Sequence, residues 1–175
     1  MVRRNDRVVN DSIRLLILDV DGVLTDGRLV VVESGELIKS FHVLDGGAIR
    51  LWQETGRQVG LLTARTSPAV ARRAGELGIE LIEQGIDEKL IGYERILARA
   101  GVDDAGICYV GDDFLDLAPM RRCGYPVAVA NAAAEVKRVA SYVTGRPGGA
   151  GAVREVVRHL LTRSGEWTGL LDKYA

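Results

Sequence analysis

The chain has 175 residues and a formal net charge of −1, with 47% hydrophobic and 27% charged residues. This composition is typical of one globular domain with a sizeable core, and the balanced charge argues against nucleic acid or membrane as a partner. Two cysteines, Cys108 and Cys123, are too few for a disulfide framework, so we expect a reducing compartment and a cytoplasmic protein. The first apolar run contains Asp19 and Asp21, which fits neither a signal sequence nor a membrane span.

Three segments are expected along the chain. Residues 1–12 are polar and are predicted to be frayed. Residues 13–163 are predicted to form a single domain, and 164–175 a C-terminal tail. Inside the domain, strand-like residues on both sides of Ser34-Gly35 predict a β-hairpin over 28–43. Its first arm is apolar on both faces, which favours a contact with another subunit.

Strands and helices alternate through the rest of the domain. Apolar runs bounded by polar residues predict strands at 13–19, 58–63, 80–84, 107–110, 126–129 and 142–143. Helices are predicted at 45–55, where Asp45 begins the first turn, 68–77, 87–100 with Asp87 as its cap, after Asp116 to about 123, 132–139 and 152–163. This alternation predicts an α/β fold: a Rossmann-like, doubly wound parallel sheet with helices on both faces.

Polar residues follow three of the predicted strands. Asp19, Thr63 and the pair Asp112-Asp113 each come after the last apolar residue of a strand. Because ligands of parallel sheets bind at the carboxyl ends of the strands, we expect these side chains to converge. Carboxylates suit a hard cation such as Mg²⁺, and Lys89 at a helix start adds a positive charge. These groups are the ones that phosphoryl transfer needs, and without a P-loop motif a carboxylate nucleophile is the familiar route.

Four motifs in order resemble those of the haloacid-dehalogenase superfamily. Asp19-Val20-Asp21-Gly22-Val23 resembles the first motif, D-x-D-x-[TV]. Thr63 matches the second motif, Lys89 the third, and Gly111–Asp116 the fourth. One such motif alone is weak evidence for the superfamily. Four motifs in order, each at the expected strand end or helix start, are strong evidence.

A closer resemblance, over roughly residues 13–163, is to the 3-deoxy-D-manno-octulosonate 8-phosphate phosphatase family. It rests on residues 19–27, the hairpin, 41–46 and the glycine-rich 148–155. The resemblance implies a cap-less hydrolase that uses Mg²⁺ on a small-molecule sugar-acid phosphate in lipopolysaccharide precursor biosynthesis. It also implies a homotetramer that assembles through the β-hairpin.

The resemblance implies a role for each motif residue. Asp19 attacks phosphorus, and Asp21 protonates the leaving oxygen and then activates water. The Asp19 carboxylate, the Asp21 backbone carbonyl and Asp112 hold Mg²⁺, while Thr63 and Lys89 hold the phosphoryl oxygens.

Four further residues receive supporting roles. Asp113 and Asp116 orient metal-bound waters or the lysine, although Asp116 is equally suited to satisfy a helix N-terminus. Arg65 and Arg73 are candidates for the sugar-acid carboxylate, with a solvated surface position nearly as well suited to Arg73.

Two other functions stay open at this point. A phosphatase for a nine-carbon, sialic-acid-type 9-phosphate usually carries glutamate where Arg65 stands, so Arg65 favours the eight-carbon acid. A non-catalytic tetramerisation module, as found fused to cytidylyltransferases, has no use for a complete charged site. Ala64 stands where these phosphatases usually have glycine, and Gly46-Gly47-Ala48 differs from their usual pattern, which leaves the substrate open.

Overall fold

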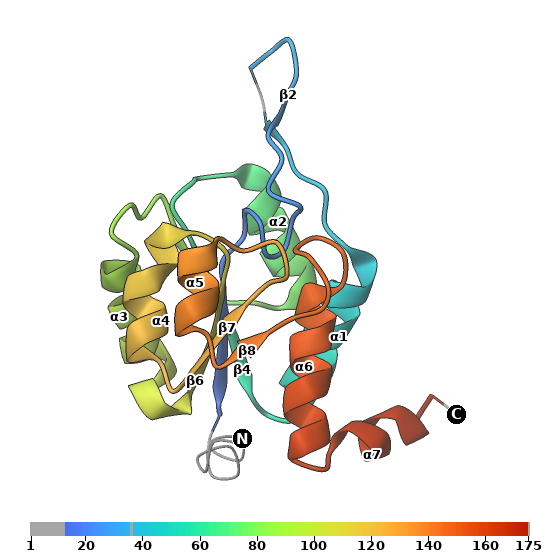
Figure 1. Ribbon diagram of the computed structural model, residues 1–175. Coiled ribbons are helices and arrows are strands. Elements are labelled where there is room, and N and C mark those ends of the chain that lie inside the picture. Colours follow the sequence, from blue (N-terminus) through green and yellow to red (C-terminus); the bar gives the residue numbers. More distant parts are fainter. Residues whose placement is uncertain (1–12, 36, 175) are drawn as a thin grey trace.

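The computed structural model describes residues 13–35 and 37–174, so the predicted frayed segment 1–12 lies outside the described residues. A parallel sheet forms its centre (Figure 1). The strands are β1 (Leu15–Leu18), β4 (Gln58–Thr63), β5 (Leu81–Gln84), β6 (Ile107–Gly111), β7 (Tyr125–Ala128) and β8 (Tyr142–Val143). Their order is β5-β4-β1-β6-β7-β8, and every neighbouring pair is parallel.

Helices cover both faces of this sheet. They are α1 (Val43–Glu54), α2 (Pro68–Leu77), α3 (Lys89–Ala100), α4 (Leu117–Arg122), α5 (Ala134–Val139), α6 (Ala152–Arg163) and α7 (Trp167–Asp172), with short 3₁₀ turns η1 (Asp104–Gly106) and η2 (Phe114–Asp116). Helices α3, α4 and α5 lie on one side, and α1 packs against α6 on the other (Figure 1). The predicted doubly wound α/β fold is therefore confirmed.

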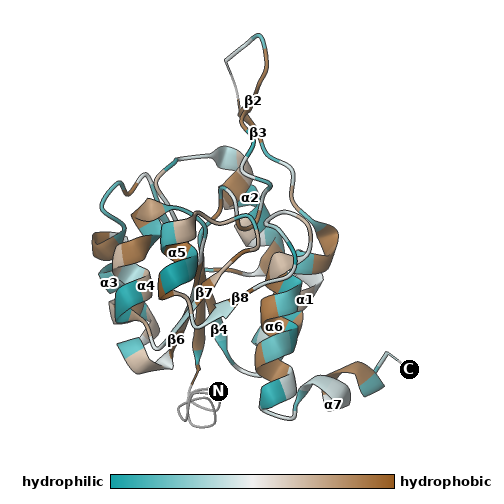
Figure 2. Cartoon of the chain, viewed as in Figure 1, coloured by the Kyte–Doolittle hydropathy of each residue, from teal (hydrophilic) through white to brown (hydrophobic). Residues whose placement is uncertain are grey.

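Strand β1 occupies the middle of the sheet and carries the acidic loop at its end. All four of its residues are fully buried, because helices cover both faces (Figure 2). Leu18 is in register with Leu61 of β4 and Val110 of β6. Residues just beyond these three positions therefore meet at one edge of the sheet.

A small hairpin projects from the body of the molecule between β1 and α1 (Figure 1). Its strands β2 (Val30–Val31) and β3 (Leu37–Ile38) are antiparallel, with Val30 opposite Ile38. The paired part is shorter than the predicted 28–43, since α1 already begins at Val43. Val30, Val31 and Ile38 are each more than half exposed, so the hairpin presents apolar surface to solvent (Figure 2).

Two predicted helix starts were wrong. Helix α1 begins at Val43, before Asp45, and α3 begins at Lys89 after Glu88, so Asp87 is not its cap. The buried Asp45 carboxylate instead accepts hydrogen bonds from the backbone N–H groups of Gly151 (3.3 Å) and Arg154 (2.8 Å). A carboxylate is favourable there because the amino end of α6 carries partial positive charge.

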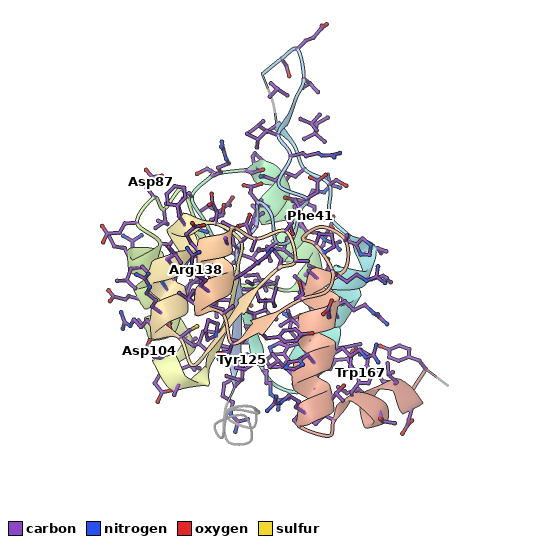
Figure 3. All side chains as sticks on the ribbon, viewed as in Figure 1. Phe41, Asp87, Asp104, Tyr125, Arg138 and Trp167 are labelled. Atoms are coloured by element: carbon purple, nitrogen blue, oxygen red, sulfur yellow. The ribbon has the colours of Figure 1, made fainter. Side chains whose placement is uncertain are left out.

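The described part of the predicted tail contains α7. Arg57 donates from Nη2 to Oε2 of Glu166 at 2.7 Å, which ties the start of this helix to the domain. Trp167 lies at the start of α7 (Figure 3). The Arg154 guanidinium is 5.9 Å from the centre of its ring. Among the residues described, no helix is both long and apolar enough to cross a membrane.

Candidate active site

A cavity of about 270 Å³ opens at the carboxyl ends of β1, β4 and β6. Every residue predicted for the site lines it, with the exception of Arg73. Leu29 at the base of the hairpin closes one side. The convergence expected from the strand ends is thus what the fold produces.

Lys89 lies between two buried carboxylates. Its Nζ donates to Oδ1 of Asp19 and to Oδ1 of Asp116, both at 2.6 Å. Burial lowers the pKa of Lys89, but the two carboxylates outweigh it and raise the pKa overall, so the ammonium stays charged. Burial also raises the pKa of Asp19 well above its usual range, opposed by Lys89. The site therefore concentrates charge where water is largely excluded.

Asp116 is an anchor for the site. Besides Lys89, its Oδ1 accepts a hydrogen bond from the Tyr109 hydroxyl at 2.7 Å. Its Oδ2 accepts from the backbone N–H groups of Asp112 (2.9 Å) and Asp113 (3.2 Å). The two roles weighed for Asp116 are both present, because it satisfies the start of η2 and orients Lys89. A side chain at Gly111 would collide with it, since a Cβ there would lie 2.6 Å from its carboxyl carbon.

The acidic residues suit a metal ion. Asp19, Asp112 and Asp116 offer oxygen atoms that all lie within 4.8 Å of one another. The oxygens of Asp116 already accept four hydrogen bonds, which leaves Asp19 and Asp112 as the better ligands. Burial and the nearby Asp116 raise the pKa of Asp112 to about 6, a crowding of negative charge that a cation would relieve. An all-oxygen set fits a hard cation such as Mg²⁺.

Gly22 allows the acidic loop to approach Asp112. Its φ of +102° lies in the left-handed region, and a Cβ there would lie 2.0 Å from Oδ2 of Asp112. Glycine is therefore required between the loop that carries Asp21 and the end of β6.

Sequence reasoning missed Lys39. Its ammonium, on a side chain only 4% exposed, forms an ion pair with Oδ1 of Asp21. The other oxygen, Oδ2 of Asp21, is buried and has no hydrogen-bond partner among the described residues. Lys39 belongs to no motif, and its only sequence signal is its place just after the hairpin, where the chain returns past the acidic loop.

Thr63, Arg65 and Asp113 occupy the rim and floor of the cavity. The buried Thr63 Oγ1 accepts a hydrogen bond from the Arg65 backbone N–H at 3.3 Å, which leaves the hydroxyl hydrogen for a ligand. Arg65 lines the cavity beside it. Asp113 accepts from the Phe114 backbone N–H at 2.7 Å and caps η2. Among the described residues the hydrogen bonds of the Lys89 ammonium go to Asp19 and Asp116 and not to Asp113.

Arg73 is not brought to this cavity. Its Nη1 donates to Oε2 of Glu76 at 3.1 Å on its own helix. Its guanidinium also packs against Gly46, where a Cβ would lie 2.3 Å from Nη2. Arg73 therefore packs α2 against α1, and its prediction as a partner of Arg65 is not supported by this placement.

The glycine-rich loop 145–151 packs directly on the acidic loop. The Gly149 N–H donates to the Val23 carbonyl at 3.0 Å, and Gly148 donates to Oδ1 of Asn131 at 2.8 Å. A Cβ at Gly148 would lie only 1.7 Å from the Gly22 carbonyl oxygen. The glycine-rich loop thus packs against the backbone of the acidic loop, next to Asp21, and supports its position.

Known proteins match the chain along most of its length. The haloacid dehalogenase-like hydrolase family matches residues 68–155. The 3-deoxy-D-manno-octulosonate 8-phosphate phosphatase KdsC of Haemophilus influenzae is 41% identical over 156 residues, which are 89% of this chain and 87% of that protein. KdsC of Escherichia coli K12 is 42% identical over 156 residues, 89% of this chain and 83% of that one.

Solved structures agree with this likeness. A probable yrbi family phosphatase from Pseudomonas syringae superposes with a TM-score of 0.92 at 39% identity and 94% coverage of both chains. The Moraxella catarrhalis 3-deoxy-D-manno-octulosonate 8-phosphate phosphatase, in complex with a magnesium ion, a phosphate ion and a KDO molecule, gives 0.91 at 34% identity, also over 94% of both. The chain belongs to the 3-deoxy-D-manno-octulosonate 8-phosphate phosphatase family of haloacid dehalogenase-like hydrolases.

Proposed function

We propose that this chain is a Mg²⁺-dependent phosphatase that converts 3-deoxy-D-manno-octulosonate 8-phosphate to the free sugar acid and inorganic phosphate. The observation that carries the proposal is Lys89 held between Asp19 and Asp116, with Asp112 beside them in one small cavity. This arrangement joins a nucleophile, a phosphate-binding cation and a metal site. The likeness to the Moraxella enzyme with magnesium, phosphate and KDO supports the substrate.

Asp19 and Asp21 divide the chemistry between them. A carboxylate oxygen of Asp19 forms a bond to phosphorus as the bond from phosphorus to the sugar oxygen breaks, and Asp21 gives that oxygen a proton. Asp21 then takes a proton from water, whose oxygen attacks phosphorus and releases Asp19. The Lys39 ammonium holds Oδ1 of Asp21, so Oδ2 is the oxygen left to exchange the proton.

The remaining groups neutralise and position the phosphoryl oxygens. The Lys89 ammonium and the Thr63 hydroxyl line the cavity and can donate to these oxygens. Carboxylates of Asp19 and Asp112, with the Asp21 backbone carbonyl, would hold Mg²⁺, which supplies positive charge opposite the developing negative charge. Asp116 keeps Lys89 in place through its own four hydrogen bonds.

Arg65 is our candidate for the carboxylate of the sugar acid. It lines the cavity, whereas Arg73 is engaged elsewhere. A guanidinium binds a carboxylate through two parallel hydrogen bonds. A phosphate ester that has no carboxylate cannot form this pair of bonds with Arg65. The nine-carbon acid phosphate also has a carboxylate, so the preference for the eight-carbon acid rests on the resemblance at position 65 and not on this contact.

A phosphate-release screen over sugar-acid phosphates tests this function. We expect the eight-carbon 8-phosphate to give the highest kcat/KM, with the nine-carbon 9-phosphate and simple hexose phosphates below it. A higher kcat/KM for the nine-carbon ester would mean that this ester is the substrate, while the proposed phosphatase mechanism would still apply. Failure to release phosphate from any ester in the presence of Mg²⁺ would favour the non-catalytic module instead.

Assembly through the hairpin forms part of the proposal. The exposed apolar side chains of Val30, Val31 and Ile38 support a tetramer in which hairpins of neighbouring subunits pack together. Sedimentation should then give a tetramer that Val31→Asp disrupts. The two buried free cysteines, Cys108 and Cys123, agree with the proposed cytoplasmic location.

A further inference from the structure

A second, larger cavity lies on the other side of the loop 145–151. It has a volume of about 610 Å³ and opens between the start of α1, β8 and the outer face of α6. It shares no lining residue with the active-site cavity. Its size falls within the range of roughly 300–1,000 Å³ typical of small-molecule sites. We refer to it as the arginine pocket, after Arg146, Arg154, Arg158 and Arg163 on its walls.

The guanidinium groups of this pocket have few partners. Among the described residues, those of Arg146, Arg158 and Arg163 make no hydrogen bond or ion pair, and that of Arg154 rests over a tryptophan ring. Three of the four lie on one helix, with Arg146 facing them from the glycine-rich loop. A chain with a net charge of −1 thus gathers four cations around one concave surface, three of them without a hydrogen bond or ion pair among the described residues.

One carboxylate, that of Glu155, is found among the described residues that line the pocket, and it offsets one of the four positive charges by interacting with Arg146. Oε1 of Glu155 accepts hydrogen bonds from the Tyr142 hydroxyl (2.7 Å) and the Gly145 N–H (2.8 Å). Its Oε2 accepts from the Arg146 backbone N–H at 2.9 Å. Glu155 therefore holds the loop in place, and four guanidinium groups against one carboxylate leave the pocket with an excess of positive charge.

Two imidazoles complete the wall. His159 stacks on Tyr142 with ring centres 4.1 Å apart, and burial together with Arg163 lowers its pKa, so it adds a neutral, flat surface. Nδ1 of His42 is buried without a hydrogen-bond partner among the described residues. A ligand oxygen at this position would satisfy a polar atom that is otherwise left unpaired.

We propose that the arginine pocket binds a small polyanion that carries two phosphoryl groups. Guanidinium groups bind phosphoryl oxygens through paired, charge-assisted hydrogen bonds, and four of them around one cavity match two such groups better than one. The site is separate from the proposed catalytic centre and does not depend on its chemistry. Inorganic pyrophosphate and an organic bisphosphate share the required groups.

Calorimetric titration of the full chain with pyrophosphate, in EDTA at low salt, tests the site. Without a divalent cation the acidic active site does not attract the anion. We expect saturable binding that the double variant Arg158→Ser/Arg163→Ser weakens by at least about tenfold, because two charge-assisted contacts are lost. Both arginines are exposed and form no ion pair within the described part of the chain, so the variant should keep its fold, which circular dichroism checks.

Arg121→Ser is the matched control, since Arg121 is an exposed arginine of α4 without an ion pair among the described residues. It should leave the affinity unchanged. A parallel titration with fructose 1,6-bisphosphate assigns the site to an organic or an inorganic ligand, according to which binds more tightly. Equal weakening by Arg121→Ser, or no saturable binding to the wild type, would overturn the proposal. A change in sedimentation of the double variant, without anion binding by the wild type, would make the pocket a contact between copies of the chain.

Discussion

The Lys39 ammonium on the hairpin side of the cavity forms an ion pair with Oδ1 of Asp21, and both groups are largely buried. This contact connects the projecting hairpin to the residue that we expect to exchange protons with the substrate. It also determines which oxygen of Asp21 is free. The hairpin therefore contributes to the geometry of the site as well as to the surface.

Lys39→Met should impair proton transfer to the leaving group. We expect kcat/KM for a sugar phosphate to fall about 10- to 100-fold, part of the 10²–10⁴ that general acid catalysis contributes. For p-nitrophenyl phosphate, whose phenolate leaves without a proton, kcat/KM should stay within about threefold of the wild type. Because kcat/KM reports steps up to departure of the leaving group, the comparison isolates this proton transfer.

Lys39→Arg should restore much of the lost activity, and Arg28→Met, which removes an exposed cation from the same hairpin, should change neither ester. An equal loss for both esters in Lys39→Met would mean that Lys39 supports phosphate binding and not Asp21.

Asp19→Asn should abolish turnover without harming the fold. Removal of the nucleophile should lower kcat by more than about 10³-fold. Burial disfavours the charge of Asp19, and an amide oxygen still accepts the Lys89 hydrogen bond, so the melting temperature in EDTA should equal or exceed that of the wild type. Phosphate release and differential scanning calorimetry measure the two effects. Wild-type turnover would remove Asp19 as the nucleophile.

Asp116→Asn should behave differently, because it loses stability as well as activity. An amide nitrogen would face donors that now point at a carboxylate, from Lys89, Tyr109 and two backbone N–H groups. Breaking such a buried network costs roughly 3–5 kcal/mol. At about 2–4 °C per kcal/mol, the melting temperature should fall by roughly 10 °C.

Asp113→Asn is the control for this variant, since Asp113 caps η2 at an exposed position and asparagine caps a helix about as well as aspartate, so the cost should stay below about 1 kcal/mol. A melting temperature for Asp116→Asn equal to that of Asp113→Asn would contradict the anchoring role of Asp116.

The strand ends of the site were predictable from sequence because the pattern is local. A continuous apolar run that ends in Asp19 predicts a buried central strand with an aspartate at its carboxyl end. The run before Asp112 predicts the same arrangement. Convergence then follows from the parallel sheet alone. Thr63 and Lys89 were predicted from the order of the four motifs. Both residues line the cavity that also contains Asp19 and Asp112.

The contacts that escaped prediction join residues distant in sequence. Lys39 reaches Asp21 because the hairpin returns beside the loop it left, and no local pattern encodes that path. Asp45 reads as a cap for its own helix, yet its partners on α6 lie more than 100 residues away. Arg73 lies at the expected place on α2, but packing against Gly46 directs its guanidinium away from the cavity.

Magnesium binding should weaken as the pH falls through about 6. EDTA should stop turnover and Mg²⁺ should restore it. In the metal-free protein the pKa of Asp112 is about 6 against an ordinary 3.8, so below pH 6 the cation must displace a proton. The same shift makes the metal-free fold gain stability from Asp112 as the pH falls from 7 toward 4, because the folded state then binds the extra proton.

The rise in melting temperature on addition of Mg²⁺ measures this linkage, since a ligand of the native state stabilises it. The rise should be large at pH 7.5, shrink through pH 6 and be absent in Asp112→Asn at any pH. A rise that is the same at pH 5 and pH 7.5 would contradict a protonated Asp112 in the free site.

Gly148→Ala should damage catalysis through the acidic loop, although residue 148 does not line the active-site cavity. A methyl group there would lie 1.7 Å from the Gly22 carbonyl oxygen, so the glycine-rich loop or the acidic loop must move. A displacement of about 1 Å at Asp21 costs on the order of 10²-fold in rate.

Gly47→Ala is the matched control, because a Cβ in that helical position meets nothing within 4 Å and should stabilise the chain by about 0.5–1 kcal/mol. We therefore expect kcat/KM to fall in Gly148→Ala and to stay at the wild-type value in Gly47→Ala. Wild-type kcat/KM in Gly148→Ala would show that Asp21 keeps its position without support from the glycine-rich loop.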